Sequence, residues 1–141
     1  MSKIVIIGAG AMGSAFALPC LDNNHDINII GTHLENDSID QLKNNNNLHP
    51  GLNTKIPQEI KIFKFEKFNE LLKSNVDLIV LGISSKGIEW AADQLSRLYK
   101  DSKIPKLLML TKGLSIHNNQ YELLVDKLKR LLADRGIKKV D

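Results

Sequence analysis

The stretch KIVIIGAGAMGSAF, residues 3–16, decides the fold of this chain. An apolar, β-branched run ends at Gly8, and Gly8, Gly10 and Gly13 then follow the spacing G-x-G-x-x-G before a helical pattern begins. In this context, between a strand and a helix, the pattern indicates a dinucleotide site. Gly8 permits the tight turn, Gly10 lets a pyrophosphate approach the backbone, and Gly13 lets the helix pack closely on the strand. The alternative is a strand-to-helix turn that binds nothing.

The composition is that of one domain with a sizeable core, because 43% of the 141 residues are hydrophobic and 25% are charged. The net charge is +3, and basic residues are slightly concentrated between Lys127 and Lys139. We interpret this cluster as a solvated helix face, since the chain carries no recognisable nucleic-acid-binding module. The sequence therefore predicts no nucleic-acid partner.

Several other classes of protein are excluded or disfavoured by residue usage. Cys20 is the only cysteine, which excludes a disulfide framework and a cysteine-based metal site. The four histidines fall in different loops without ligand spacing, so no metal site is expected. No run approaches the roughly 18 apolar residues of a membrane span, and no signal-peptide pattern is present. We expect a soluble, cytoplasmic protein.

Strands and helices alternate along the chain. The apolar patterns predict strands over 3–7, 27–30, 59–65, 76–83 and 106–110, and helices over 11–23, 35–43, 66–74, 87–99 and 121–132. Pro19 is expected to kink the first helix, and residues 44–47 and 49–57 are expected to be irregular. Continuous apolar strands such as 76–83 indicate a sheet covered on both faces. The predicted fold is α/β, a doubly wound, mainly parallel Rossmann-type sheet that binds ligands at the carboxyl ends of its strands.

The end of the second strand bears on the choice of nucleotide. An NAD-specific site usually has Asp or Glu there to bond the ribose 2′-OH, but residues 31–33 are Gly, Thr and His, and Glu35 comes too late for a confident match. Thr32 can donate to a hydroxyl or a phosphate. His33 is either a partly cationic partner for a 2′-phosphate or a solvent-exposed loop histidine. NADP is permitted and NAD is not excluded.

Two later strand ends carry further candidate residues. Ile83 and Ser84 follow Gly82 after the strand 76–83. A small residue there leaves room for a nucleotide and a hydroxyl can bond it, although Ser84 or Ser85 can also cap the next helix. Lys112 follows the strand 106–110. This lysine either binds a phosphate or polarises a carbonyl during hydride transfer, or it is a solvated loop lysine.

The chain resembles the N-terminal domain of the NAD(P)-dependent sn-glycerol-3-phosphate dehydrogenases, and its archaeal-type members most of all. GAGAMGSAFALPCLDNN, IIGTHLEN, HPGL, LIVLGISSKGI and LTKGL occur in family order over nearly the whole chain. The resemblance implies that the cofactor, NAD or NADP, is held by Gly8, Ala9, Gly10, Ala11, Met12 and Gly13 at its pyrophosphate, by Thr32 and His33 near the adenosine ribose, and by Ile83 and Ser84 beside it. Many members have a proline at the position of Ile83. The resemblance places Lys112 in the active site, near substrate and nicotinamide.

The resemblance also implies an activity, the reversible reduction of dihydroxyacetone phosphate to sn-glycerol 3-phosphate by an enzyme expected to be a homodimer when full length. The family's second catalytic lysine and its substrate-phosphate residues lie in a C-terminal helical domain that residues 1–141 do not include. We therefore expect residues 1–141 to form the cofactor domain and to be inactive alone. Two alternatives remain: a ketopantoate or 3-hydroxyacid reductase, which would lack TKGL, and a nucleotide-sensing regulatory domain, which would give Lys112 no role.

Overall fold

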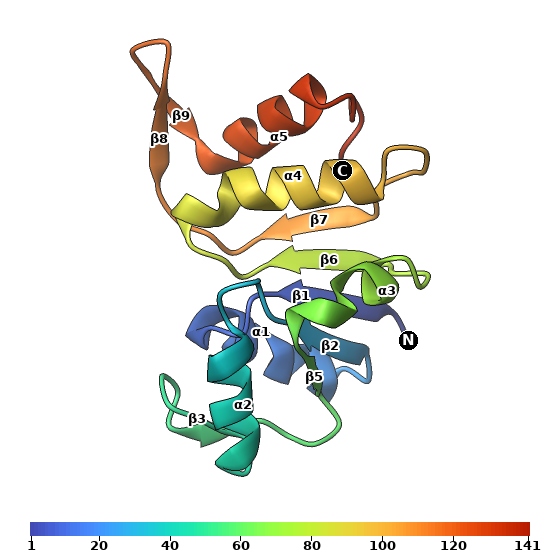
Figure 1. Cartoon of the computed structure of the whole chain (residues 1–141), viewed down its shortest axis with the longest axis vertical. Coiled ribbons are helices and arrows are strands. Elements are labelled where there is room, and N and C mark those ends of the chain that lie inside the picture. Colours follow the sequence, from blue (N-terminus) through green and yellow to red (C-terminus); the bar gives the residue numbers. More distant parts are fainter.

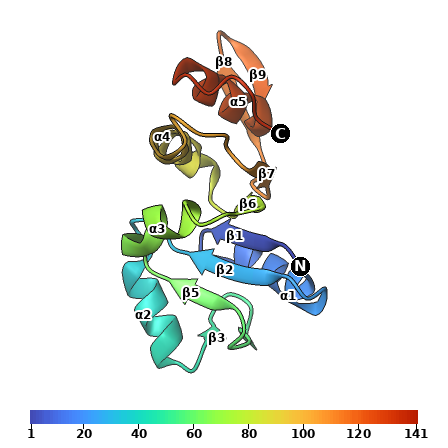
Figure 2. The same cartoon turned by 90° about the vertical axis from the view of Figure 1, so that its right-hand side faces the viewer.

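A five-stranded parallel sheet organises the molecule, whose computed structural model describes all 141 residues. The strands run in the order β5-β2-β1-β6-β7, as Figures 1 and 2 show from two sides. Their bounds are β1 (Lys3–Ile7), β2 (Asp26–Ile30), β5 (Lys61–Phe63), β6 (Leu78–Leu81) and β7 (Lys106–Met109). The chain builds one half outward from β1 to β5, then crosses to β6 and β7. The order of the strands therefore reverses beside β1, where open α/β sheets bind ligands.

Helices cover both faces of the sheet, which confirms the predicted fold class. They are α1 (Ala11–Asp22), α2 (Asn36–Asn44), α3 (Phe68–Leu72), α4 (Ile88–Leu98) and α5 (Leu124–Asp134), with 3-10 turns η1 (Phe65–Lys67) and η2 (Ser85–Gly87). Alternate residues of β1 point to opposite faces. Ile4 and Ile6 belong to a core cluster with residues of α1 and α2, whereas Val5 and Ile7 belong to one with α3, α4 and α5.

The predicted elements hold in the first part of the chain: β1 matches its predicted span and β2 begins one residue earlier, whereas β5, β6 and β7 are shorter than expected. The helix α1 continues through Pro19 and is followed by Asn23 at its C-cap, as the sequence predicts; the kink at Pro19 stays a prediction. The stretch 49–57 is less irregular than expected, because β3 (Leu48–His49) and β4 (Thr54–Lys55) form a short antiparallel pair. The strand β7 (Lys106–Met109) is only half-buried, because it is an edge strand of the sheet.

The prediction of a last helix from residue 121 is wrong at its start. Residues 114–123 form an antiparallel hairpin of β8 (Leu114–His117) and β9 (Gln120–Leu123), and α5 begins only at Leu124. Asn118 and Asn119, with φ of 50° and 62°, form the two-residue turn. Positive φ at both turn residues is what a tight hairpin needs, and Asn tolerates it. Tyr121 therefore pairs with Ile116 across the hairpin.

The hairpin carries its polar side chains toward α5 and leaves an apolar face exposed. Glu122 accepts two hydrogen bonds from Arg130 of α5, at 2.8 and 3.0 Å, and one from Ser115 at 3.0 Å. On the opposite face Ile116 and Tyr121 are 72% and 81% exposed. Figures 1 and 2 show the hairpin beside α5, at the end of the molecule farthest from β5. No helix in the structure is both long enough and apolar enough to cross a bilayer.

Candidate functional site

The glycine turn between β1 and α1 uses its three glycines in two different ways. Gly8 has φ of +109°, and a Cβ there would lie 2.4 Å from the Gly82 carbonyl oxygen. A Cβ on Gly13 would lie 2.7 Å from the Gly8 oxygen. A Cβ on Gly10 meets nothing within 4 Å. The first and third glycines are therefore needed for packing, whereas Gly10 leaves an open approach to the backbone.

The first turn of α1 is suited to an anion. Gly10 is its N-cap in extended conformation, no side chain caps the helix, and no acidic residue lies in the first turn. The first backbone N–H groups of a helix lack partners inside the helix, and they form the positive end of its dipole. Phosphates bind at such ends.

A cavity of about 600 Å³ opens beside Gly10 at the carboxyl ends of β1, β2 and β6. Trp90 of α4 forms an aromatic wall with His33, their ring centroids 5.2 Å apart, and Phe65 and Phe68 pack behind them. The rings of Trp90 and His33 are tilted by 35° to each other. A cavity that joins such an aromatic wall to an open helix N-terminus suits a molecule with an aromatic ring and a phosphate. Its lining comprises Gly10, Thr32, His33, Leu34, Glu35, Gly82, Ile83, Ser84, Lys86, Gly87 and Trp90.

The structure brings most of the predicted cofactor residues together. Gly10, Thr32, His33, Ile83 and Ser84 all line this cavity. Gly8, Ala9 and Gly13 form the turn behind it, and Ala11 and Met12 are exposed in the first turn of α1. His33 is exposed, yet it contacts Trp90 and is not a free loop side chain. Ser84 is the N-cap residue of η2, the 3-10 turn that leads into α4, but its side chain makes no capping bond, and the N-cap of α4 itself is Gly87.

Lys112 lies at the same edge of the sheet but outside this cavity. Its side chain is exposed after β7 and forms no salt bridge or hydrogen bond. The neighbouring Thr111 donates its hydroxyl to the carbonyl oxygen of Ile83 at 2.7 Å. That bond ties the loop that carries Lys112 to the loop that lines the cavity. Lys112 therefore follows a residue that is tied to the cavity loop, and its own side chain is exposed.

Sequence reasoning missed four residues of this region. Trp90 and Lys86 line the cavity from the start of α4, and the single tryptophan of the chain near a strand end was the available signal. Glu35, set aside as too late, accepts hydrogen bonds from the N–H groups of Ala9 and Thr32 at 3.0 and 2.9 Å. His49, taken only as a loop histidine, is buried against Ala9 at 3.0 Å. No local pattern places residues 9, 35 and 49 together.

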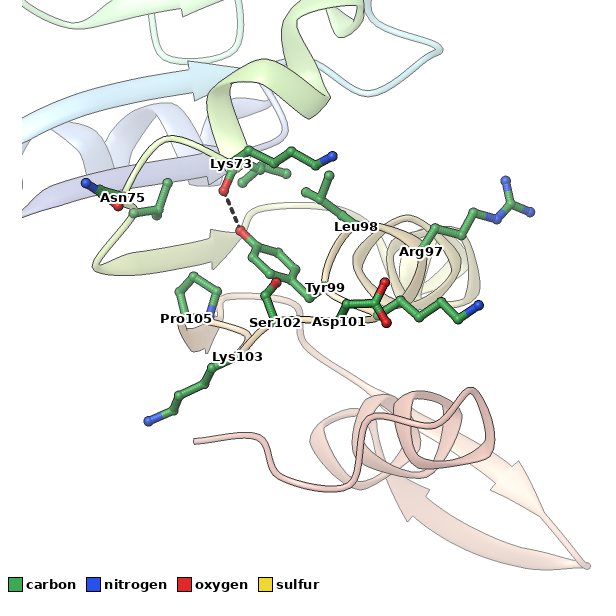
Figure 3. A pocket seen from close by; sticks show the side chains of 12 residues that line it. Lys73, Asn75, Arg97, Leu98, Tyr99, Asp101, Ser102, Lys103 and Pro105 are labelled. Atoms are coloured by element: carbon green, nitrogen blue, oxygen red, sulfur yellow. Dashed lines mark hydrogen bonds between the residues drawn. The ribbon is translucent and has the colours of Figure 1, made fainter.

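A second groove of similar size lies at the opposite edge of the sheet (Figure 3). It is bounded by the last turn of α4, which carries Arg97, and by residues that follow α3 and α4 and precede β6 and β7, among them Lys73 and Lys103. The Tyr99 hydroxyl donates to the Leu72 carbonyl oxygen at 2.6 Å, and burial raises the pKa of Tyr99 to about 12. Both helices present their C-terminal ends here, where the dipole is negative and attracts cations. This backbone environment disfavours a phosphate, although Lys73 and Lys103 line the groove.

Comparisons with known proteins show the family of the chain. The family model for the N-terminus of NAD-dependent glycerol-3-phosphate dehydrogenase matches residues 3–138. The NADP(+)-dependent glycerol-3-phosphate dehydrogenase of Archaeoglobus fulgidus is 29% identical over 93% of this chain and 37% of its own length. Glycerol-3-phosphate dehydrogenase (NAD(P)+) of Bacillus pumilus is 32% identical over 81% of this chain and 31% of its own length.

Solved structures share the fold. Glycerol-3-phosphate dehydrogenase from Coxiella burnetii superposes with a TM-score of 0.72 at 20% identity, over 99% of this chain and 38% of that one. A UDP-glucose dehydrogenase from Pyrobaculum islandicum gives a TM-score of 0.65 at 16% identity, over 100% of this chain and 34% of that one. The chain thus spans 37% or less of the two sequence relatives compared here.

Proposed function

The chain belongs to the family of the NAD-dependent glycerol-3-phosphate dehydrogenase N-terminus, and from this premise we propose that residues 1–141 bind NAD(H) or NADP(H) for a dehydrogenase. The reaction that we assign to the whole enzyme is reversible hydride transfer between the nicotinamide and dihydroxyacetone phosphate, which gives sn-glycerol 3-phosphate. Gly8 to Gly13 receive the pyrophosphate in this proposal, and Thr32, His33, Ile83 and Ser84 line the path of the nucleotide.

The observation that carries the proposal is the open side of Gly10. A Cβ there meets no atom within 4 Å, although Cβ atoms on Gly8 and Gly13 would clash with backbone. The glycine is therefore not explained by packing. A turn that leaves open space above an uncapped helix N-terminus is what close approach of a pyrophosphate requires.

Calorimetric titration with NADH and NADPH tests the proposal in the wild type and in Gly10→Val. The valine would fill the space above the turn, so affinity should fall at least about 100-fold, or roughly 2.7 kcal/mol. Thermal unfolding should stay close to wild type, because the new side chain meets no protein atom at its Cβ. Ala15→Val, on the exposed side of the same helix, is the matched control and should bind normally. Equal binding by wild type and Gly10→Val would refute the proposal.

The same site favours weak discrimination between the two nucleotides. Each carboxylate oxygen of Glu35 already accepts a backbone N–H, from Ala9 and from Thr32. Glu35 is thus turned toward these backbone donors, and residues 31–33 supply no further carboxylate for the ribose 2′-OH, the contact that usually selects NAD. Thr32→Asp should add a charge that repels a 2′-phosphate and should shift preference toward NAD. A wild type that excludes NADP by more than about 100-fold, roughly 2.7 kcal/mol, would contradict this assignment.

We assign Lys112 to the reaction and not to the fold. Its ammonium is unpaired, and the bond from Thr111 to Ile83 anchors the preceding residue at the ligand edge, so the lysine can stabilise charge that develops on a carbonyl oxygen or bind a phosphate. In the full-length protein, Lys112→Ala should lower turnover at least about 100-fold, roughly 2.7 kcal/mol, with unchanged thermal stability and nucleotide affinity. Lys103→Ala, at the opposite edge, is the control. Near-normal turnover of Lys112→Ala would leave the residue a solvated loop lysine.

A further inference from the structure

The second residue of the glycine turn is held from two sides by side chains that are distant in sequence. The Ala9 N–H donates to Oε2 of Glu35 at 3.0 Å, while the Ala9 carbonyl oxygen lies 3.0 Å from Nε2 of His49. Glu35 precedes α2, and His49 ends the short strand β3. The Ser14 hydroxyl of α1 also donates to the Ala9 oxygen, at 3.4 Å. The shorter bonds that fix the turn we assign to the pyrophosphate thus come from groups outside the strand and helix that it connects.

The hydrogen bonds of His49 define which ring nitrogen carries the hydrogen. The Gly51 N–H donates to Nδ1 of His49 at 3.1 Å, so Nδ1 is an acceptor without a hydrogen. A neutral imidazole then carries its hydrogen on Nε2, which donates to the Ala9 oxygen. The ring is only 6% exposed. Burial and both bonds hold this tautomer and this ring orientation.

The bond from His49 also sets the direction of the next backbone donor. The Ala9 carbonyl and the Gly10 N–H belong to one planar peptide group, and the chain has no cis peptide bond. In a trans peptide the C=O and N–H point in opposite directions. Because His49 holds the oxygen, the Gly10 N–H points away from His49, and it has no hydrogen-bond partner within the chain. Gly10 lines the large cavity, whereas the Ala9 N–H is occupied by Glu35.

We propose that His49 is a positioning residue for the cofactor's pyrophosphate, because it fixes the Ala9–Gly10 peptide so that the free Gly10 N–H is available to a phosphate oxygen. This inference rests on the proposed nucleotide site and adds a residue that does not itself touch the nucleotide. A peptide that is already oriented loses less conformational freedom when the ligand binds.

Two substitutions separate the two bonds of the ring. His49→Gln places an amide N–H near the position of Nε2 and keeps the donor to Ala9. His49→Asn places a carbonyl oxygen near the position of Nδ1 and keeps the acceptor for Gly51 without a donor to Ala9. Binding of NADH should weaken about tenfold in His49→Asn and by less than about threefold in His49→Gln, which is the scale of one hydrogen bond. Binding of adenosine, which has no phosphate, should not change in either variant.

The wild type and both variants are compared by calorimetry with NADH and adenosine and by thermal unfolding. Loss of NADH affinity in step with melting temperature, or equal affinity in all three proteins, would overturn the role of His49. Nitrogen-15 NMR of the ligand-free wild type gives an independent readout: a hydrogen on Nδ1 would also overturn it, whether or not nucleotide binds. A wild type with the expected tautomer that binds neither nucleotide refutes the proposed function, and with it this role.

Discussion

The two large cavities of this domain have similar volumes, about 600 Å³ each, but opposite backbone environments. The cavity at the carboxyl edge adjoins the N-terminus of α1 and is walled by His33 and Trp90. The groove at the amino edge adjoins the C-termini of α3 and α4, and Lys73 and Lys103 line it. Side-chain charge alone would assign the phosphate to the groove. Helix direction favours the carboxyl edge, where we propose that it binds.

The comparison teaches that lysines are a poor guide to a phosphate site when helix ends are near. A lysine beside the last carbonyl groups of a helix is satisfied by the negative end of the dipole. The glycine turn has no cation in its first helical turn, yet it offers free N–H groups at a positive end. The following predictions test this contrast between the two edges, from the largest expected effect to the smallest.

Gly8→Ala should have the largest effect, and on stability. The added Cβ would lie 2.4 Å from the Gly82 oxygen at a residue with φ of +109°, so unfolding free energy should fall by about 3 kcal/mol or more. Gly10→Ala, two residues later, should change stability by less than about 1 kcal/mol. Urea titration of both variants measures the difference. Equal destabilisation would contradict the distinction between Gly8, which is needed for packing, and Gly10, which faces open space.

Tyr99→Phe should show that the amino-edge groove is a structural junction. The variant leaves the Leu72 carbonyl oxygen without its donor, and should lose about 1 kcal/mol of stability. In the wild type the folded pKa of Tyr99, about 12, lies above the ordinary value of 10.0. Stability is therefore present below pH 10 and is lost as pH rises toward 12. Unfolding measured between pH 9 and 12 should show this loss in the wild type and a smaller one in Tyr99→Phe.

Lysine substitutions at the two edges should affect nucleotide binding differently. Lys86→Ala, which removes a cation that lines the carboxyl-edge cavity, should weaken NADPH binding by about three- to tenfold at low salt. Lys103→Ala, which removes one from the amino-edge groove, should leave binding unchanged. Titration of both variants with NADPH at two salt concentrations decides the matter. A larger effect of Lys103→Ala would move the phosphate site to the other edge.

The smallest effect is expected from the ion pair between Glu122 of the hairpin and Arg130 of α5, which lines neither of the two cavities. The Arg130 guanidinium, with help from Ser115, lowers the pKa of Glu122 from the ordinary 4.5 to about 2. A folded pKa below the unfolded value means that the stabilisation is present above pH 4.5 and is lost as pH falls toward 2. Glu122→Gln should flatten this part of the acid unfolding profile and leave nucleotide affinity unchanged. An unaltered acid profile would show that the pair contributes nothing measurable.

The order of strands and helices was predictable because short apolar runs, typical of buried strands, alternate along the chain with apolar residues at helical spacing. The same reasoning failed at Tyr121, which continues the helical apolar stripe of α5 yet lies in β9. Two asparagines in positive φ close a hairpin there, and pairing with Ile116 replaces helix packing. The local periodicity of apolar residues cannot reveal that two residues pair across neighbouring strands. The partial burial of β7 likewise follows from its position at the edge of the sheet, which cannot be predicted from its apolar sequence.

The sequence by itself determined the sheet, the glycine turn and five of the residues that line the cavity, because each follows from a short pattern at a strand end. Only the tertiary structure decided the roles of Glu35, His49 and Trp90. Glu35 and His49 meet at Ala9 from segments 26 and 40 residues away, and Trp90 packs beside His33 in the cavity wall. Packing of helices on both faces sets these contacts, and such long-range geometry leaves no local pattern in the chain.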